Sequence, residues 1–159
     1  MLDSELELLP FNEVQLDAAA SLFVEVFAAE PWREAWTLER ARRRLGDLLR
    51  SPGFLGIAAC YEGELVGFAL GRLEVYQDED HFHLHEMCVA ARRQRQGVGT
   101  RMVALLETQL RERGCRQIYL LTARGTAAES FYVNRGFSPA QRTGVMVKRL
   151  RSRSGRGRL

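Results

Sequence analysis

The chain has 159 residues, 46% hydrophobic and 27% charged, a size and composition that suit one globular domain with a single core. No apolar run approaches the ~20 residues that span a bilayer, and no basic and then apolar N-terminus indicates a secretion signal. We therefore expect a soluble, cytoplasmic protein and set membrane and secreted classes aside.

The formal charge of +3 arises from the C-terminus, because six cations and no acid lie after residue 147 and the preceding chain is mildly acidic. This Ser/Gly/Arg-rich end is too polar to pack in a core. We expect a domain over residues 1–150 and a basic, unstructured tail over residues 151–159. Arginine is frequent throughout the chain, so the tail alone does not indicate a nucleic-acid partner, and we expect a monomer or a homodimer.

Three cysteines, Cys60, Cys88 and Cys115, lie far apart in apolar segments. Their spacing suits neither a metal site nor a disulfide framework. We expect them to be reduced packing residues.

The first third of the chain predicts a strand and two helices. Residues 5–9 alternate between polar and apolar, and Asn12 is a suitable N-cap for a helix with apolar residues at helical spacing. A break at Pro31-Trp32 follows. Thr37 then caps a second helix, which ends before Pro52-Gly53.

The middle of the chain predicts three antiparallel strands. The apolar runs 54–61 and 65–76 flank Glu62-Gly63, which predicts a hairpin turn, and an acidic loop leads into a third strand over residues 81–89.

From Gly97 the apolar period becomes helical and continues to Gly114. A strand over residues 117–122 follows, and Thr126 to Glu129 form a capping box that begins another helix. Residues 145–150 predict a last strand. The sequence thus predicts an α+β fold with a mixed central sheet, in which an antiparallel meander precedes a crossover helix and a parallel strand.

Two glycines, Gly97 and Gly99, stand where a strand gives way to a helix. Unpaired N–H groups and the positive end of the helix dipole make such a helix start suitable for a phosphate. Met102 occupies the place of the third glycine in the dinucleotide fingerprint, and no Gly-Lys-Ser/Thr follows. NAD and ATP are therefore disfavoured as ligands.

Three motifs around this turn resemble those of the GNAT superfamily of acetyl-CoA-dependent N-acetyltransferases. The run 94–99, Gln-Arg-Gln-Gly-Val-Gly, fits the family's Q/R-x-x-G-x-G/A signature. The segments 86–89 and 131–137 are similar to the family's fourth strand and to its aromatic-Tyr-x-x-x-Gly-Phe helix end. The resemblance implies a GNAT-like sheet, flanked by four helices, whose fourth and fifth strands splay around acetyl-CoA.

The resemblance also implies which residues bind acetyl-CoA. Backbone N–H groups of the glycine turn would hold the pyrophosphate, and strand groups left unpaired by the splay would hold the pantetheine and the thioester oxygen. The implied cofactor-binding residues are Met87, Cys88, Val89, Gln94, Arg95, Gln96, Gly97, Val98, Gly99 and Thr100.

Acetyl transfer to an amine needs a base for the ammonium and an acid for the departing thiolate. Tyr132 matches the family's general-acid tyrosine. Glu86, His83 and His85 are candidates for the base, with Glu86 slightly preferred. Together with His81, the two histidines could share a strand face and bind zinc, but the family reading requires no metal and we predict none.

The predicted acceptor is a primary amine of a small cationic molecule. Glu86 and an acidic cluster could attract it, and Trp32 and Trp36 could form an apolar or cation–π wall. The cluster consists of Glu74, Asp78, Glu79 and Asp80. A protein N-terminus or lysine is the alternative acceptor, and a non-catalytic acetyl-CoA-binding module is the alternative function.

Overall fold

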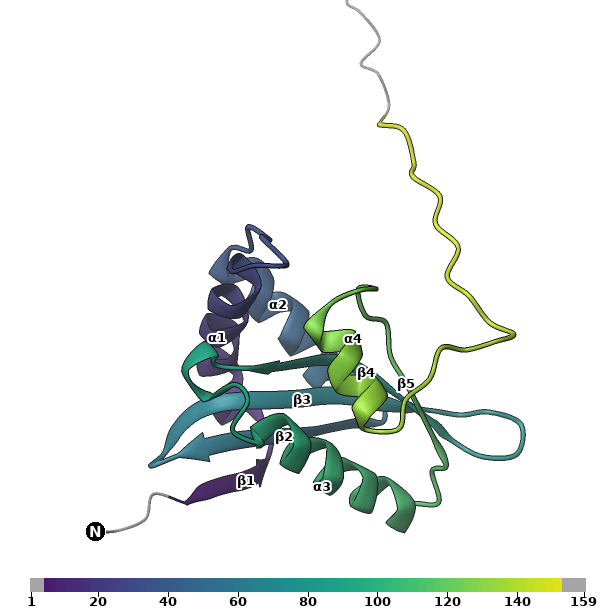
Figure 1. Ribbon diagram of the computed structural model, residues 1–159, viewed down its shortest axis with the longest axis horizontal. Coiled ribbons are helices and arrows are strands. Elements are labelled where there is room, and N and C mark those ends of the chain that lie inside the picture. The colour runs from purple at the N-terminus through teal and green to yellow at the C-terminus, as the bar shows by residue number, and fades with distance from the viewer. Residues whose placement is uncertain (1–4, 153–159) are drawn as a thin grey trace, which may run out of the picture.

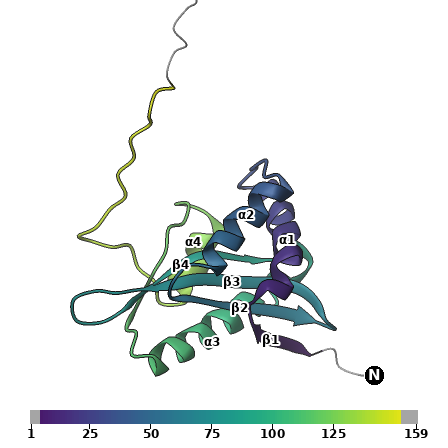
Figure 2. The ribbon, with the colours of Figure 1, turned by 180° about the vertical axis from the view of Figure 1, so that it is seen from behind.

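The computed structural model describes residues 5–152 and has a mixed sheet between two pairs of helices (Figures 1 and 2). The elements, in chain order, are β1 (Leu6–Pro10), a 3₁₀ turn (Glu13–Gln15), α1 (Leu16–Ala28), α2 (Leu38–Leu49), β2 (Phe54–Tyr61), β3 (Glu64–Glu74), β4 (His81–Val89), a second 3₁₀ turn (Ala91–Arg93), α3 (Val98–Glu112), β5 (Gln117–Tyr119) and α4 (Ala127–Asn134). Helices α1 and α2 cover one face of the sheet, and α3 and α4 lie on the other.

The five strands lie in the order in which they occur in the sequence. The first four pair antiparallel, and β5 pairs parallel to β4 after the crossover through α3. The α+β class and the predicted strand order are therefore confirmed. Among residues 5–152, no helix is both long and apolar enough to cross a membrane.

The core lies where the helices pack on the sheet. Phe23 from α1, Phe68 and Phe82 from the sheet, and Met102 and Leu106 from α3 are each at most 2% exposed. Burial of side chains of this size stabilises the fold by roughly 1.5–3 kcal/mol each. The three cysteines are free and buried, as predicted.

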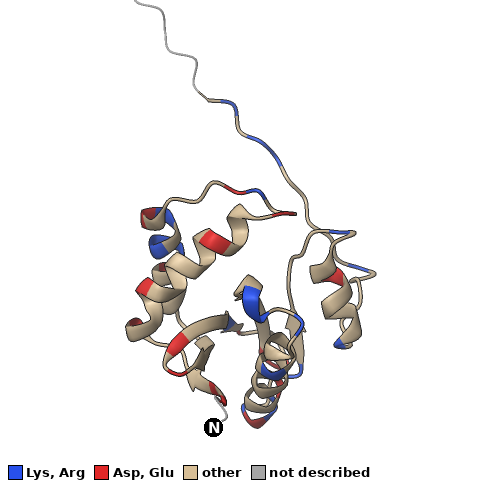
Figure 3. Cartoon of the chain, turned by 60° about the vertical axis from the view of Figure 1, so that its left-hand side comes forward, with Lys and Arg blue, Asp and Glu red and all other residues tan. Residues whose placement is uncertain are grey.

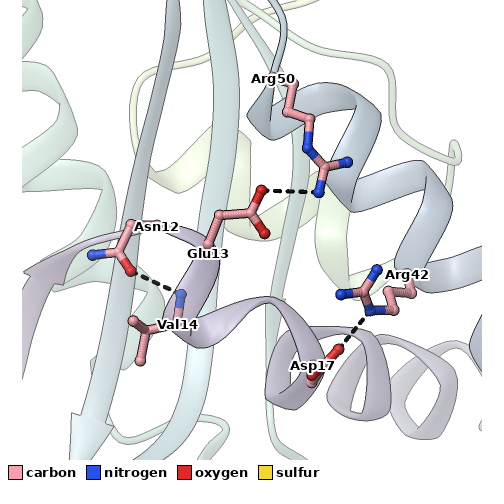
Figure 4. A network of polar contacts seen from close by, with 6 residues as sticks. All are labelled: Asn12, Glu13, Val14, Asp17, Arg42 and Arg50. Carbon is pink, nitrogen blue, oxygen red and sulfur yellow. Dashed lines mark hydrogen bonds and ion pairs between the residues drawn. The ribbon is translucent and has the colours of Figure 1, made fainter.

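Polar contacts fix the start of α1 against α2 (Figure 4). The Asn12 side chain accepts a hydrogen bond from the Val14 N–H at 2.9 Å and forms a capping box with Gln15. Glu13 pairs with Arg50, the C-cap of α2, and Asp17 pairs with Arg42 of α2. Such exposed pairs contribute about 0–1 kcal/mol each to stability, so their main effect is on the position of α2 beside α1.

The predicted strand over residues 145–150 is wrong. Residues 138–152 contain no helix or strand and extend away from the domain, and this segment carries Lys and Arg but no Asp or Glu (Figures 1 and 3). Val145, Met146 and Val147 are 67%, 97% and 87% exposed. Apolar alternation is not enough for a strand, because the backbone groups also need a neighbour to bond to.

Two other predicted strands are shorter in the structure. β3 ends at Glu74 and β5 at Tyr119, because the pairing with β4 ends at these points. The proposed division at residue 150 stays a prediction, and the part of the tail over residues 153–159 lies outside the described residues.

A bulge interrupts the pairing of β3 with β4. Leu70 pairs with Glu86 and Gly71 with Leu84, so His85 is the extra residue in β4. A Cβ atom on Gly71 would clash with the carbonyl oxygen of His83 and lie 2.5 Å from Cζ of Phe82. The absent side chain at Gly71 therefore allows the strands to approach each other beside the bulge.

Gly71→Ala is expected to lower the free energy of unfolding by about 1–3 kcal/mol, because the neighbours of the added methyl are backbone and a buried ring. Urea denaturation measures this loss. Gly144→Ala is the matched control, since its Cβ meets nothing within 4 Å, and a shift within about 0.5 kcal/mol is expected. Equal effects of the two variants would contradict the close approach at Gly71.

Candidate functional site

The loop between β4 and α3 presents backbone N–H groups at the start of a long helix. Gly97 is the N-cap of α3 and has a φ of 83°, and Arg95 has a φ of 60°. Left-handed backbone of this kind favours glycine. The N–H groups of Val98, Gly99 and Thr100 have no acceptor within the helix, so the turn can bind an anion.

Two glutamine side chains brace this loop from within. The Gln94 amide donates to the carbonyl of Val89 at 2.9 Å, and the Gln96 amide donates to the carbonyl of Arg92 at the same distance. These two predicted cofactor-binding residues therefore have a role in shaping the loop. Of the others, Val98 is buried in the core, whereas Arg95 and Gly97 are exposed.

The two glycines of the turn differ in their surroundings. A Cβ on Gly97 would meet nothing within 4 Å, whereas a Cβ on Gly99 would lie 3.2 Å from Cζ of Phe131. Gly97 thus leaves the approach to the helix start open, and Gly99 allows α3 to pack closely against α4.

β4 and β5 separate after three paired positions. His81, Phe82 and His83 pair with Gln117, Ile118 and Tyr119, and the rest of β4 has no partner on this side. The backbone of Met87 and Val89 therefore faces an opening where a ligand can bond to it. This is the splay that the family resemblance implied.

A cavity of about 280 Å³ occupies the opening, and we call it the strand cavity. Its lining combines β4, the segment after β5, α4 and the end of α1. The residues that line it are Phe27, Trp32, Glu34, Leu84, His85, Glu86, Met87, Leu120, Leu121, Thr122, Ala123, Ala128 and Tyr132. Cys88 is buried and does not line the strand cavity.

Tyr132 enters the strand cavity from α4. The Thr126 side chain caps this helix by accepting from the Glu129 N–H at 3.3 Å, as predicted. The Tyr132 ring packs edge-on against Phe131 and Phe137, with centroids 5.3 and 5.4 Å apart. Burial, with a smaller effect of Cys88 and Glu86, raises the pKa of Tyr132 to about 12. The hydroxyl is therefore protonated near neutral pH.

Among residues 5–152, Glu86 is the one buried charged residue, and it is 8% exposed. Its carboxylate pairs with the Arg44 guanidinium of α2. Burial raises the pKa of Glu86 above its usual value, although the hydrogen bond from Arg44 opposes this effect. Glu86 is therefore a stronger base than a carboxylate in water.

The histidines of β4 form a row of stacked rings. The rings of His83 and His85 lie 3.7 Å apart, and His83 also stacks on Tyr119 at 4.4 Å. His83 Nδ1 is 3.5 Å from a Glu74 carboxylate oxygen. His85 lines the strand cavity, whereas His83 does not.

The pKa of His85 is lowered to about 4, mainly by partial desolvation and then by His83 and Arg72. Desolvation also lowers the pKa of His83, against the attraction of Glu74. Both imidazoles are therefore neutral near pH 7. Within residues 5–152, no group of three or more His, Cys, Asp or Glu side chains is placed to hold a metal ion.

A second and larger cavity of about 540 Å³ lies between α2 and the sheet, and we call it the arginine groove. Its lining residues are Trp36, Arg40, Arg43, Arg44, Asp47, Leu48, Ser51, Arg72, His85 and Glu86. Only His85 and Glu86 line both the strand cavity and the groove. The two spaces therefore meet at the bulge of β4.

The two predicted tryptophans lie in different cavities. Trp32 lines the strand cavity and packs on Phe27 at 5.6 Å. Trp36 lines the arginine groove and packs on Phe23 at 5.0 Å, with the Arg44 guanidinium 5.5 Å from its ring centre. Both rings are thus part of the packing and also of a cavity wall.

The predicted acidic cluster is not at the site. Of the acids that the sequence suggested for the acceptor, only Glu86 lines either cavity. Glu74 accepts a hydrogen bond from the Tyr119 hydroxyl at 2.5 Å, and Glu79 lies near His81 and Arg116. Glu74 and Glu79 therefore contact neighbouring side chains outside both cavities.

Sequence reasoning missed the arginines of the groove. Arg40, Arg43 and Arg44 appear in the sequence as the polar face of an amphipathic helix, and Arg72 as one cation in a strand. In a chain with frequent arginine, no local signal distinguishes these side chains. Only the packing of α2 over β3 brings them together.

The sequence matches the Acetyltransferase (GNAT) family over residues 21–137, which is well over half of the chain. The protein therefore belongs to the GNAT family of acetyltransferases, as the motifs predicted. Members of this family use acetyl-CoA. A comparison with curated proteins found no match.

Solved structures with the same fold include a possible acetyltransferase from Clostridium difficile 630, with a TM-score of 0.78 and 10% identity over 92% of this chain and 99% of that one. The aminoglycoside N-acetyltransferase AAC(6')-Iy in complex with CoA has a TM-score of 0.73 and 18% identity, over 92% and 97%. The aminoglycoside acetyltransferase meta-AAC0020, from an uncultured soil metagenomic sample, has a TM-score of 0.72 and 18% identity, over 95% and 100%. At these identities the likeness shows the fold.

The lowered pKa of His85 predicts a loss of stability in acid. Between its ordinary pKa of 6.5 and the folded value of about 4, the unfolded chain binds a proton that the folded chain excludes. The free energy of unfolding should therefore fall as the pH drops through this window. His85→Asn should reduce that fall, measured by urea denaturation at pH 7, 6, 5 and 4.5. Parallel curves for the variant and the wild type would contradict the prediction.

Proposed function

We propose that this protein is an acetyl-CoA-dependent N-acetyltransferase that transfers the acetyl group directly to the primary amine of a small molecule. This amine is a cationic ammonium group before the reaction. The supporting observation is that the strand cavity, which Tyr132 lines, meets the arginine groove at His85 and Glu86. Gly99 of the glycine turn lies beside Met87 in the wall of the same cavity. Donor and acceptor could thus enter from different sides and meet at one place.

The residues fit acetyl-CoA in two ways. The turn from Gln94 to Thr100 offers backbone N–H groups and an open approach at Gly97 for the diphosphate. On the edge of β4 that β5 leaves unpaired, the backbone of Met87 and the N–H of Val89, with Cys88 between them, are available to the pantetheine and the thioester oxygen. A backbone N–H donated to that oxygen would stabilise the negative charge that develops on it.

The proposed reaction assigns each proton. Glu86 takes a proton from the acceptor ammonium, directly or through water, and frees the nitrogen lone pair. As the new C–N bond forms and the C–S bond breaks, the Tyr132 hydroxyl gives its proton to the departing sulfur. The new amide nitrogen then loses its second proton, which restores the Tyr132 hydroxyl, and Glu86 releases its proton to water. The net change is acetyl-CoA and ammonium to CoA thiol, amide and one proton.

The pKa shifts favour Glu86 over the histidines as the base. A raised pKa makes the Glu86 carboxylate a better proton acceptor, whereas the lowered pKa of His85 makes its imidazole a weaker one. His83 is less suited still, because it stacks on Tyr119 outside both cavities. His85 remains the second candidate, since it lies at the same junction.

Two structures of similar fold support a small amine as the acceptor, because they are aminoglycoside acetyltransferases. A protein N-terminus or lysine, and a module that binds acetyl-CoA without turnover, are the alternatives. Release of CoA thiol with small amines would support the proposal. Release with peptides alone would support a protein acceptor, and binding without release would support the module.

Gly97→Val is expected to weaken acetyl-CoA binding about tenfold or more, because a β-branched residue disfavours the left-handed backbone by about 1–2 kcal/mol and crowds the helix start. Isothermal titration calorimetry measures the affinity. Gly114→Val is the matched control, since Gly114 has a φ of 76° and open surroundings at the other end of α3. An equal loss of affinity in both variants, or no binding by the wild type, would contradict the assignment.

Tyr132→Phe should lower kcat by roughly 10²-fold or more, in the range of general acid catalysis, while the affinity for acetyl-CoA stays close to that of the wild type. Steady-state thiol release and calorimetry measure the two quantities. Tyr76→Phe is the control, because Tyr76 is 49% exposed and lines neither cavity. Full activity of Tyr132→Phe would remove the tyrosine from the mechanism.

A further inference from the structure

The arginine groove carries an excess of positive charge. Four arginines line it, against the carboxylates of Asp47 and Glu86. His85, the one other titratable group in the lining, is neutral near pH 7 because its pKa is lowered to about 4. The walls of the groove therefore attract anions.

Two of these arginines lack a carboxylate partner. Arg44 pairs with Glu86, and Arg43 lies 3.9 Å from Asp47. Within residues 5–152, neither Arg40 nor Arg72 takes part in an ion pair. The excess charge of the groove therefore belongs to side chains that are free to bind a ligand.

Arg72 has an unusual environment for a free cation. It is a half-buried strand residue of β3, and its Nε atom is covered from solvent and donates no hydrogen bond to any described residue. An unsatisfied buried donor typically costs about 1–3 kcal/mol. A ligand oxygen that accepted from Nε itself would recover that cost.

The free arginines lie in the same groove as the proposed base. Arg40 comes from α2 and Arg72 from β3, and the groove between these elements reaches Glu86 and His85. The charge of Arg72 acts on His85 itself, since it contributes to the lowered pKa of the imidazole. One small molecule could therefore contact the arginines and the base together.

We propose that the acceptor carries an oxyanion, a carboxylate or a phosphate, in addition to its reacting amine, and that Arg40 and Arg72 bind this oxyanion. This inference rests on the proposed function and narrows the acceptor class. Guanidinium groups suit such ligands because their planar donors match pairs of oxygens. A polycation without an anionic group would instead meet the positive walls of the groove.

The first test compares acceptors that differ only in charge. Amino acids and an aminoalkyl phosphate are assayed beside the carboxamides and the alcohol of the same skeletons, and CoA thiol release gives kcat/KM. We expect the anionic member of a reactive pair to have a kcat/KM at least about tenfold higher, the effect of about 1.4 kcal/mol in binding. The gain should lie in KM for the acceptor.

The second test needs no turnover. Succinate is titrated calorimetrically into protein saturated with CoA, so that the proposed diphosphate site is filled. Arg40→Gln should weaken succinate binding about tenfold and leave CoA affinity unchanged. Arg40 is exposed and unpaired, so this variant should fold, and Arg72→Gln is a second variant for the buried side of the groove.

Arg42→Gln is the matched control for Arg40→Gln. Arg42 is an exposed residue of the same helix, but it pairs with Asp17 and lies outside the groove. The Arg42→Gln variant should bind succinate as tightly as the wild type. The inference would be overturned if Arg40→Gln left the affinity for succinate unchanged and if acids and amides had equal kcat/KM.

The two proposals fail in different ways. Absence of acetyl-CoA binding would overturn the proposed function, and the succinate titration of wild type and Arg40→Gln without CoA would still decide the oxyanion site. Thiol release with cationic and neutral amines in preference to anionic ones would support the acetyltransferase and overturn the oxyanion inference.

Discussion

The architecture of the site depends on a difference in how far β4 pairs with its two neighbouring strands. β3 pairs with β4 along its length, whereas β5 pairs with only its first three residues. An unpaired strand edge in the middle of a domain is costly unless another group bonds to it. The strand cavity lies beside this edge, so a ligand in it could bond to the backbone groups that β5 leaves free.

The bulge in β4 converts this opening into a junction. In a regular strand, neighbouring residues point to opposite faces, and His85 and Glu86 would serve different sides of the sheet. With His85 as the extra residue, both side chains line both cavities. The bulge depends in turn on Gly71, whose missing side chain admits the His83 backbone.

Local chemistry made most of the fold and the glycine turn predictable. The caps at Asn12, Thr37 and Thr126 lie where the sequence placed them, because a cap depends on a few adjacent residues. The prediction of a strand at 145–150 was wrong because a strand needs a second segment to pair with, and the pattern of one segment does not show whether such a partner exists. The arginine groove could not be predicted for the same reason, since α2 and β3 contribute to it from distant parts of the chain.

The ion pair of Arg44 with Glu86 gives the oxyanion site a further consequence for the chemistry. A buried carboxylate loses much of its stabilisation if its partner leaves, yet the hydrogen bond from Arg44 lowers the pKa of Glu86, so that breaking this bond makes the carboxylate a stronger base for the substrate's proton. An acceptor with both charges resolves this conflict, because its ammonium can take the place of Arg44 beside Glu86 while its oxyanion, held by Arg40 and Arg72, lies in the same groove as the released guanidinium. The negative charge of the acceptor then balances part of the positive charge of the groove. A simple amine would break the same pair without replacing it, so the groove favours an acceptor that carries both groups.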